Sequence, residues 1–248
     1  MPLTLRTWEV RLGIVLVASS AAIYTAKYLL LGDPENTYTY IFNALGFLPI
    51  NVLLVTLILN QLLSIRAKRE RLEKLNMVIG TFFSEAGTWL LAFISDRDSE
   101  LPELREGLIV TEAWTPETFA GVCDRLQHHH SGIAVDAADL QDLRRYLQGR
   151  RDFFLRLLEN PALLEHESFT DLLRAVFHLT EELERRDDFA GLPASDVRHL
   201  TVDIERVYRL LAREWLAYME YLQKNYPYLF SLAMRSNPFD ETASPVVR

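Results

Sequence analysis

Histidines and carboxylates in the second half of the chain could bind a metal ion. The candidates are His166, His178, Glu182, His199 and Asp203. Imidazole and carboxylate groups at helical spacings of three or four residues are the ligands of di-iron helical bundles. Such ligands must project into the bundle, whereas the apolar stripes around His178 and His199 predict that both histidines point away from the core. We therefore expect these side chains to be solvated, and a metal-binding helical-bundle enzyme is a secondary alternative.

Motifs of other catalytic classes are absent from the sequence. It holds no Walker A loop, no G-x-G-x-x-G, no H-E-x-x-H and no G-x-S-x-G. The single cysteine, Cys123, excludes a disulfide framework and sits inside a predicted helix, where a small packing role is expected. We therefore predict a protein that is not an enzyme and that needs no cofactor.

Two apolar segments near the N-terminus predict membrane-spanning helices. Residues 37–65 contain no charge, and a hydrocarbon core of ~30 Å needs about 20 residues at 1.5 Å rise each. Residues 12–31 form a second apolar segment, with Lys27 as the one charge. A cleaved signal peptide is the alternative for this segment, but its apolar character continues well past the small residues at its centre. We predict a two-helix transmembrane hairpin over residues 1–65.

A basic cluster directly after the second apolar segment predicts the topology. It comprises Arg66, Lys68, Arg69, Arg71 and Lys74. Lysine and arginine collect on the cytoplasmic side of membrane helices, and the loop between the two segments carries Asp33 and Glu35 but no base. Both termini are therefore expected in the cytoplasm of a cell whose plasma membrane holds the hairpin. The cluster itself would attract anionic lipid headgroups of the bilayer.

Small and polar residues in the hairpin suggest how its helices associate. The first segment has small residues at intervals of four, at Ala18, Ala22 and Ala26, which let a neighbouring helix approach closely. The second carries Asn43, Asn51 and Asn60. Asn60 lies about 180° around the helix from Asn51, so the three form no single polar stripe. We expect interhelical hydrogen bonds within the hairpin, and the alternative is a homo-oligomeric channel or transport pore lined by the second helix.

The segment from 75 to 94 is amphipathic and open to three interpretations. Its apolar residues follow i, i+3, i+4 spacing, and its opposite face, with Gly80, Ser84 and Glu85, is polar but hardly charged. It could be a core helix of the cytoplasmic domain, a helix lying in the membrane interface, or a third crossing. The regular polar face and Glu85 argue against a crossing, and we favour a core helix.

The remaining chain has helical periodicity and no alternating strand pattern. We expect helices from Pro116, capped by Thr115, to about His128, then at 136–159, at 168–186 with Ser168 as cap, and at 195–224, followed by a short aromatic segment at 226–230. The predicted fold is therefore all-α: the transmembrane hairpin, a basic juxtamembrane segment and amphipathic helix at 66–95, a cytoplasmic helical bundle at 96–235, and a flexible tail at 236–248.

The charge distribution restricts the partners of the cytoplasmic part. Residues 75–248 hold 18 bases and 29 acids, a net charge of −11. Because phosphate contacts require a lysine- and arginine-rich surface, we expect no nucleic-acid binding. The favoured interpretation is a non-enzymatic integral membrane protein. It would present an acidic helical module at the inner face of the membrane, for self-assembly as a homo-oligomer or for binding a membrane protein partner.

Two blocks of the sequence carry a resemblance to a known family. They are LNMVIGTFFSEAGT at residues 75–88 and YPYLFSLAMRSNPF at residues 226–239. Both resemble segments of an uncharacterised bacterial membrane-protein family whose members begin with two transmembrane helices. The resemblance would extend over most of the chain and implies a bacterial plasma membrane as its location. It implies no assigned activity and no functional residues.

Overall fold

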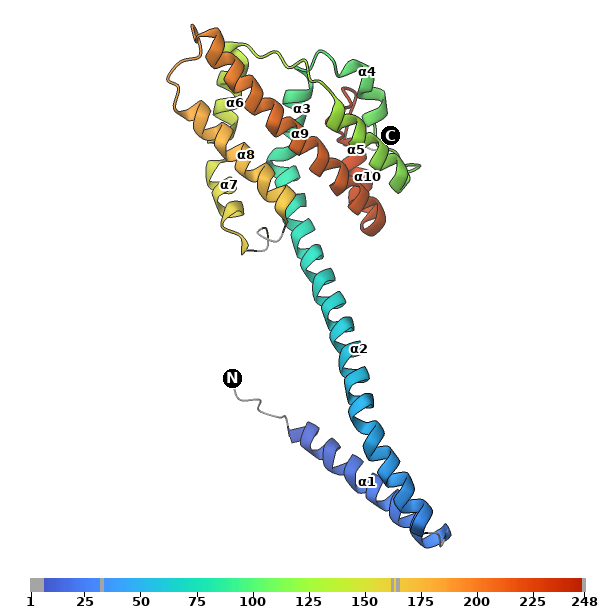
Figure 1. Cartoon of the computed structure of the whole chain (residues 1–248). Helices are drawn as coiled ribbons and strands as arrows, with labels where there is room; N and C mark the ends of the chain where they lie inside the picture. The colour runs from blue at the N-terminus through green and yellow to red at the C-terminus, as the bar shows by residue number, and fades with distance from the viewer. Residues whose placement is uncertain (1–6, 32–33, 162, 164–165, 247–248) are drawn as a thin grey trace. The chain divides into compact units, whose positions relative to one another are not determined.

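The computed structural model describes residues 7–31, 34–161, 163 and 166–246, which are mostly helical (Figure 1). Over these residues it contains no β-strand, only an isolated antiparallel bridge between Asp98 and Ile133. The all-α prediction is therefore confirmed. The chain divides into two compact units, Met1–Lys68 and Arg69–Arg248, and each is described separately.

The first unit contains α1 (Thr7–Leu31) and most of α2 (Pro34–Phe82). The two helices meet through Tyr24, whose ring lies 6.5 Å from that of Tyr40, and through Lys27, whose ammonium group lies 4.5 Å from the Tyr40 ring centroid. The three regularly spaced alanines, Ala18, Ala22 and Ala26, are exposed on α1. The contacts between α1 and α2 are made by larger side chains, and close packing of another helix against the alanine face stays a prediction.

One helix among the described residues is long and apolar enough to cross a membrane, judged by length and composition. It lies in the helical run Glu35–Ser95, and no residue of its most apolar window is buried. Ile14–Leu30 is apolar but shorter. The three asparagines of α2, Asn43, Asn51 and Asn60, are exposed as well. The interhelical hydrogen bonds expected for them are not formed within the described part of the hairpin.

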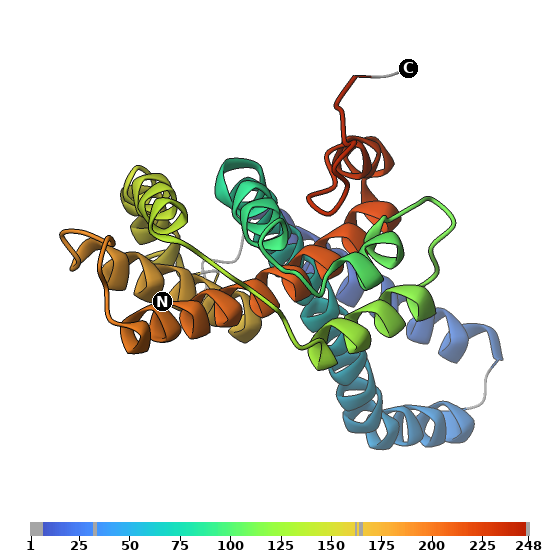
Figure 2. The same cartoon turned by 90° about the horizontal axis from the view of Figure 1, so that it is seen from above.

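The second unit begins in the last turns of α2 and is built around α9 (Ala194–Asn225). Helix α9 contacts α3, α5, α8 and α10, and both Figure 1 and Figure 2 show α8 running alongside it. The other elements are η1, a π-helical turn (Phe83–Gly87), α3 (Thr88–Ser95), α4 (Pro102–Arg105), η2 (Glu106–Leu108), α5 (Pro116–His128), α6 (Ala137–Gln148), α7 (Arg151–Leu158), α8 (Glu167–Glu184) and α10 (Pro227–Arg235).

The periodic stripe on α9 explains its central position. Leu200, Ile204, Val207 and Leu211 recur every three or four residues, and all four are buried. The helix ends at Asn225 because Pro227, which has no amide hydrogen, starts α10. The predicted range of 195–224 is therefore correct to within one residue at each end. The aromatic segment after it continues as α10 to Arg235.

Helix boundaries elsewhere agree with the sequence where conventional caps occur. Thr115 caps α5 as predicted, since its hydroxyl accepts a hydrogen bond from the Thr118 amide at 3.3 Å. The expected single helix at 136–159 is instead two helices, α6 and α7, because the backbone leaves helical geometry at Arg150. Helix α8 starts one residue before the predicted Ser168 and is capped by His166, whose Nδ1 accepts from the Phe169 amide at 3.2 Å.

The apolar face of residues 75–94 contributes to the core of the second unit. Phe82, Leu90 and Leu91 are fully buried, which agrees with the core-helix interpretation. The beginning of the predicted flexible tail is also part of the core. Phe239 is fully buried with its ring 5.3 Å from that of Trp215, and the Asn237 side chain donates to the Leu108 carbonyl at 3.1 Å. The expectation of a loose chain from residue 236 is thus corrected for its first residues.

Candidate functional site: an aromatic groove

A groove of about 720 Å³ opens on the surface of the second unit. It lies between the last turns of α2, the π-helical turn η1, the C-terminal part of α9, and α10. Ligand sites in proteins commonly have volumes of about 300–1,000 Å³. We call this feature the aromatic groove and regard it as the candidate binding site of the protein.

One wall of the aromatic groove is formed by small and polar side chains. They are Asn76, Gly80, Thr81, Ser84 and Glu85, from α2 and η1. These residues form the polar face of the amphipathic segment identified in the sequence. Because the opposite face of the same helix packs into the core, this face remains available to line a cavity.

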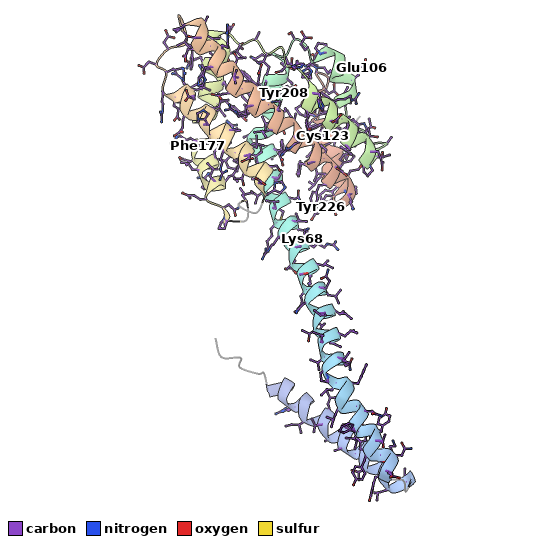
Figure 3. All side chains as sticks on the ribbon, viewed as in Figure 1. Lys68, Glu106, Cys123, Phe177, Tyr208 and Tyr226 are labelled. Atoms are coloured by element: carbon purple, nitrogen blue, oxygen red, sulfur yellow. The ribbon has the colours of Figure 1, made fainter. Side chains whose placement is uncertain are left out.

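The other wall is aromatic. Trp215, Tyr218 and Tyr221 come from α9, and Tyr226 lies at the junction of α9 and α10 (Figure 3). The ring of Tyr226 is 5.8 Å from that of Tyr221 and 6.4 Å from that of Tyr228, which it meets edge to face at 88°. This chain of ring contacts fixes the aromatic wall, because edge-to-face pairs are favourable arrangements.

The aromatic groove is nearly uncharged. Glu85 is the only charged residue among those described that line it. Burial raises the pKa of the Tyr218 phenol above its usual value. Burial also raises the pKa of Tyr221, to about 12, with further contributions from a hydrogen bond to Tyr226 and from the Glu73 carboxylate. The phenols therefore remain neutral near pH 7, and the groove suits an apolar or neutral group more than an anion.

Four of the five predicted metal ligands do come together between α8 and α9. The Nε2 atoms of His178 and His199 each lie 3.6 Å from Oδ2 of Asp203, and His199 Nε2 lies 3.7 Å from Oε2 of Glu182. Both imidazoles are about half exposed, as predicted from their positions off the apolar stripes. His166 is not part of this cluster, since it caps the start of α8 and lines a different pocket with Asp171 and Arg213.

Arginines neutralise the carboxylates of this cluster. Arg206 Nη1 lies 2.6 Å from Asp203 Oδ1, and Arg186 Nη1 lies 2.9 Å from Glu182 Oε2. Among the described residues, no group of three or more histidine, cysteine, aspartate or glutamate side chains is arranged to hold a metal ion. The cluster is therefore best described as an ion-pair network that joins α8 to α9.

The sequence analysis missed a buried pair formed by Asp98 and His129. His129 Nε2 lies 2.8 Å from Asp98 Oδ2, and the other carboxylate oxygen accepts the Gly132 amide at 2.8 Å. The pair joins the loop after α3 to the loop after α5, which also meet at the bridge from Asp98 to Ile133. The two residues are 31 positions apart in the sequence, so no local sequence pattern predicts that they pair.

Two further predicted features can be placed in the structure. The basic side chains, Arg66, Lys68, Arg69, Arg71 and Lys74, are all exposed on α2. Arg69 Nε lies 3.2 Å from Glu73 Oε1, in an exposed pair one helical turn apart. Cys123 on α5 is partly buried and packs against the core (Figure 3), in line with the expected packing role.

Comparison with known proteins identifies a family for both parts of the chain. Residues 71–235 match the family described as "Uncharacterized protein MJ1433, C-terminal helical domain", and residues 4–63 match "MJ1433, N-terminal helical domain". Uncharacterized protein MJ1433 of Methanocaldococcus jannaschii is 44% identical over 229 residues, which cover 92% of each chain. No solved structure matches. This relative is archaeal, so the bacterial setting implied by the sequence resemblance remains a prediction.

The match to MJ1433 extends over nearly the whole length of both proteins. The N-terminal domain match ends before the basic cluster, and the C-terminal domain match begins within it, at Arg71. The last turns of α2, η1 and α10, which line the aromatic groove, all lie within the C-terminal match. The chain therefore belongs to the MJ1433 family and contains both its N-terminal and its C-terminal helical domain.

Proposed function

We propose that this protein is a non-enzymatic, membrane-anchored helical module. Its first unit is a two-helix hairpin in the plasma membrane, and both termini are cytoplasmic. The second unit is an acidic helical bundle at the inner membrane face, where it assembles with further copies or binds a membrane protein partner. The basic cluster at residues 66–74 contacts anionic headgroups of the bilayer.

One observation carries this proposal: the most apolar window of α2 has no buried residue. Leu53, Leu57 and Leu63, for example, are each about 60% exposed. Soluble monomers rarely expose contiguous apolar patches larger than a few hundred Å². Hydrocarbon is a solvent in which such a surface is stable, and the basic residues that follow it are typical of a cytoplasmic membrane boundary.

The proposal is tested by the way the full-length protein associates with membranes. We expect the protein to stay with membranes during alkaline carbonate extraction and to float with lipid vesicles. Replacing Leu54 and Ile58 with arginine places two charges within the proposed span, each costing about 2.5–3.5 kcal/mol near its centre. This double variant should be partly extracted, whereas Leu72→Arg, an exposed position within the basic segment, should stay membrane-bound. Complete extraction of the unaltered protein would contradict the proposal.

The pore remains the alternative function for a membrane hairpin of this kind. The support for it is the exposure of Asn43 and Asn51 on α2, since polar side chains could line a path between several copies. Vesicles containing the full-length protein test it. We expect no ion flux, and flux that Asn51→Leu removes would favour the pore over the anchor.

A further inference from the structure

We infer that the aromatic groove binds one hydrocarbon chain of an anionic membrane lipid, whose phosphate is held by Arg69 and Lys74. This inference rests on the proposed membrane anchoring and names the ligand class of the site. It concerns the second unit alone, which contains both basic residues and the whole groove.

The spacing along α2 aligns the two basic residues with the groove. Arg69, Glu73, Asn76 and Gly80 are separated by four, three and four residues, which places them on one helical face. Asn76 and Gly80 line the groove, and Arg69 precedes Asn76 by seven residues, or about 10 Å. The Glu73 carboxylate pairs with Arg69 and also acts on the Tyr221 phenol in the aromatic wall.

Lys74 is aligned with the groove in the same way. Met77 and Thr81, three and seven residues later, both line the groove. Arg71 differs, because it shares a helical face with the core residue Phe82, eleven residues later. The positive charges that face the groove are therefore a subset of the basic cluster.

The groove suits a hydrocarbon chain, because its lining is largely apolar and some of its apolar side chains are exposed at the rim. Met77 is 64% exposed and Tyr228 71% exposed, so its rim offers apolar and aromatic surface to the solvent. Tyrosine is enriched where membrane meets water, because its ring is apolar and its hydroxyl polar. The groove lacks cations among its described lining residues, so a phosphate must bind outside it, where the two basic residues lie.

Charge complementarity selects an anionic lipid over other occupants. From residue 75 onward the chain carries a net charge of −11, so an acidic partner segment would be repelled. A lipid that carries a phosphate and a long chain matches the basic residues and the apolar groove at the same time. In the proposed membrane-anchored arrangement, the basic cluster contacts the bilayer surface, so the headgroup of such a lipid would lie beside Arg69 and Lys74.

The inference is tested by quenching of Trp215 in the full-length protein. Trp8→Phe, Trp89→Phe and Trp114→Phe leave Trp215, which lines the groove, as the only tryptophan. Phosphatidylglycerol with brominated chains is titrated into nonionic detergent micelles that contain this variant. We expect saturable quenching, at lower lipid concentrations than with brominated phosphatidylcholine. Native mass spectrometry of the unaltered chain, which should retain phosphatidylglycerol, provides a measurement that needs no tryptophan replacement.

Two matched comparisons locate the site. Replacing Arg69 and Lys74 with glutamine should raise the half-quenching concentration about 30-fold, at roughly 1 kcal/mol per charge near an anionic surface. Replacing Lys68 and Arg71, which share a helical face with the core residue Phe82, should change it little. Ser84→Phe fills the groove and should remove quenching, while Ala217→Phe, exposed on α9 outside it, should not.

Three results would overturn the inference. They are absence of quenching and of retained lipid, equal responses to phosphatidylglycerol and phosphatidylcholine, and equal effects of the two charge pairs. Vesicle flotation separates this failure from failure of the anchor: protein that floats but shows no quenching contradicts the lipid site alone. Protein that does not float contradicts the proposed function itself.

Discussion

The Tyr218 phenol lies directly over Gly80, so close that a Cβ atom on Gly80 would stand 2.6 Å from the phenol oxygen. The Tyr218 ring is held in this place by Phe83, on which it stacks at 5.6 Å and 12°. Glycine at position 80 therefore permits the approach of α9 to α2 at the floor of the aromatic groove. A larger residue must displace a ring that is fixed by its neighbour.

Gly80→Ala tests this contact. We expect the free energy of unfolding to fall by about 1–2 kcal/mol, since overpacking outweighs the gain in helix propensity. Tyr218→Phe should recover part of this loss by removing the closest atom. Gly121→Ala, on α5, is the control, because a Cβ atom at this position would have no neighbouring heavy atom within 4 Å. Thermal unfolding followed by circular dichroism measures all three, and equal stability of Gly80→Ala and the unaltered protein would contradict the predicted contact.

The adjacent residues His128 and His129 each pair with an aspartate, one on the surface and the other in the interior. Asp98 and His129 are almost fully buried, whereas Asp124 and His128 are more than 70% exposed. We expect Asp98→Ala to destabilise the second unit by roughly 3 kcal/mol, because it leaves His129 and the Gly132 amide without their acceptor. Asp124→Ala should cost less than about 1 kcal/mol. Chemical denaturation compares the two variants, and a similar cost for both would refute the structural role of the buried pair.

Arg186 makes the stability of the second unit depend on pH. Its hydrogen bonds to Glu182 at 2.9 Å and to Asp196 at 2.7 Å hold the pKa of each carboxyl below the usual values of 4.5 and 3.8. A carboxyl whose pKa is lower in the folded state stabilises the fold above its unfolded pKa. This stabilisation is lost as the pH falls through the folded pKa. The free energy of unfolding should therefore decline as the pH falls below about 5 and through the lowered pKa values of the two carboxyls.

Substitution of the arginine separates this contribution from general acid denaturation. Arg186→Gln should show a shallower decline over the same pH range, because the two carboxyls then titrate near their usual values. Arg174→Gln removes an exposed pair with Asp171 at 3.6 Å and should keep the slope of the unaltered protein. Unfolding curves at several pH values give the slopes. Identical slopes for all three proteins would show that Arg186 does not carry the effect.

The exposed alanine face of α1 is available to a second copy of the chain. Ala22→Leu should reduce the oligomer size in detergent, since a bulky side chain prevents close approach of helices. Its effect on the helical content of one chain should be small, because Ala22 is exposed there. Val17→Leu, on a different face of α1, is the control. Light scattering measures the size, and an unchanged oligomer would mean that this face contacts lipid only.

Sequence periodicity predicted most of the helices, because stripes and conventional caps are local signals. The α9 stripe and the Thr115 cap are examples. The break at Arg150 and the cap at His166 were missed, since arginine is no helix breaker and histidine is an unusual capping residue. Phe239 was assigned to a loose tail because nothing near it in sequence reveals its contact with Trp215.

The groove was predictable only in part. The polar face of residues 75–94 was visible in the sequence, but its partner wall was not, because Tyr218 and Tyr226 reach it through the packing of α9 and α10. The two sequence blocks at 75–88 and 226–239 proved to supply residues to both walls. Four of the five candidate metal ligands do lie close together, but their carboxylates form ion pairs with Arg206 and Arg186.

The anchored topology is tested most directly by cysteine labelling. In a Cys123→Ala background, Glu35→Cys places a thiol in the first turn of α2, at the proposed outer end of the hairpin, and Ser244→Cys places one near the C-terminus. The account predicts that a membrane-impermeant maleimide labels position 35 in intact spheroplasts and labels position 244 only after permeabilisation. Protection of position 35 until the membrane is opened, or recovery of the protein in the soluble fraction, would contradict it.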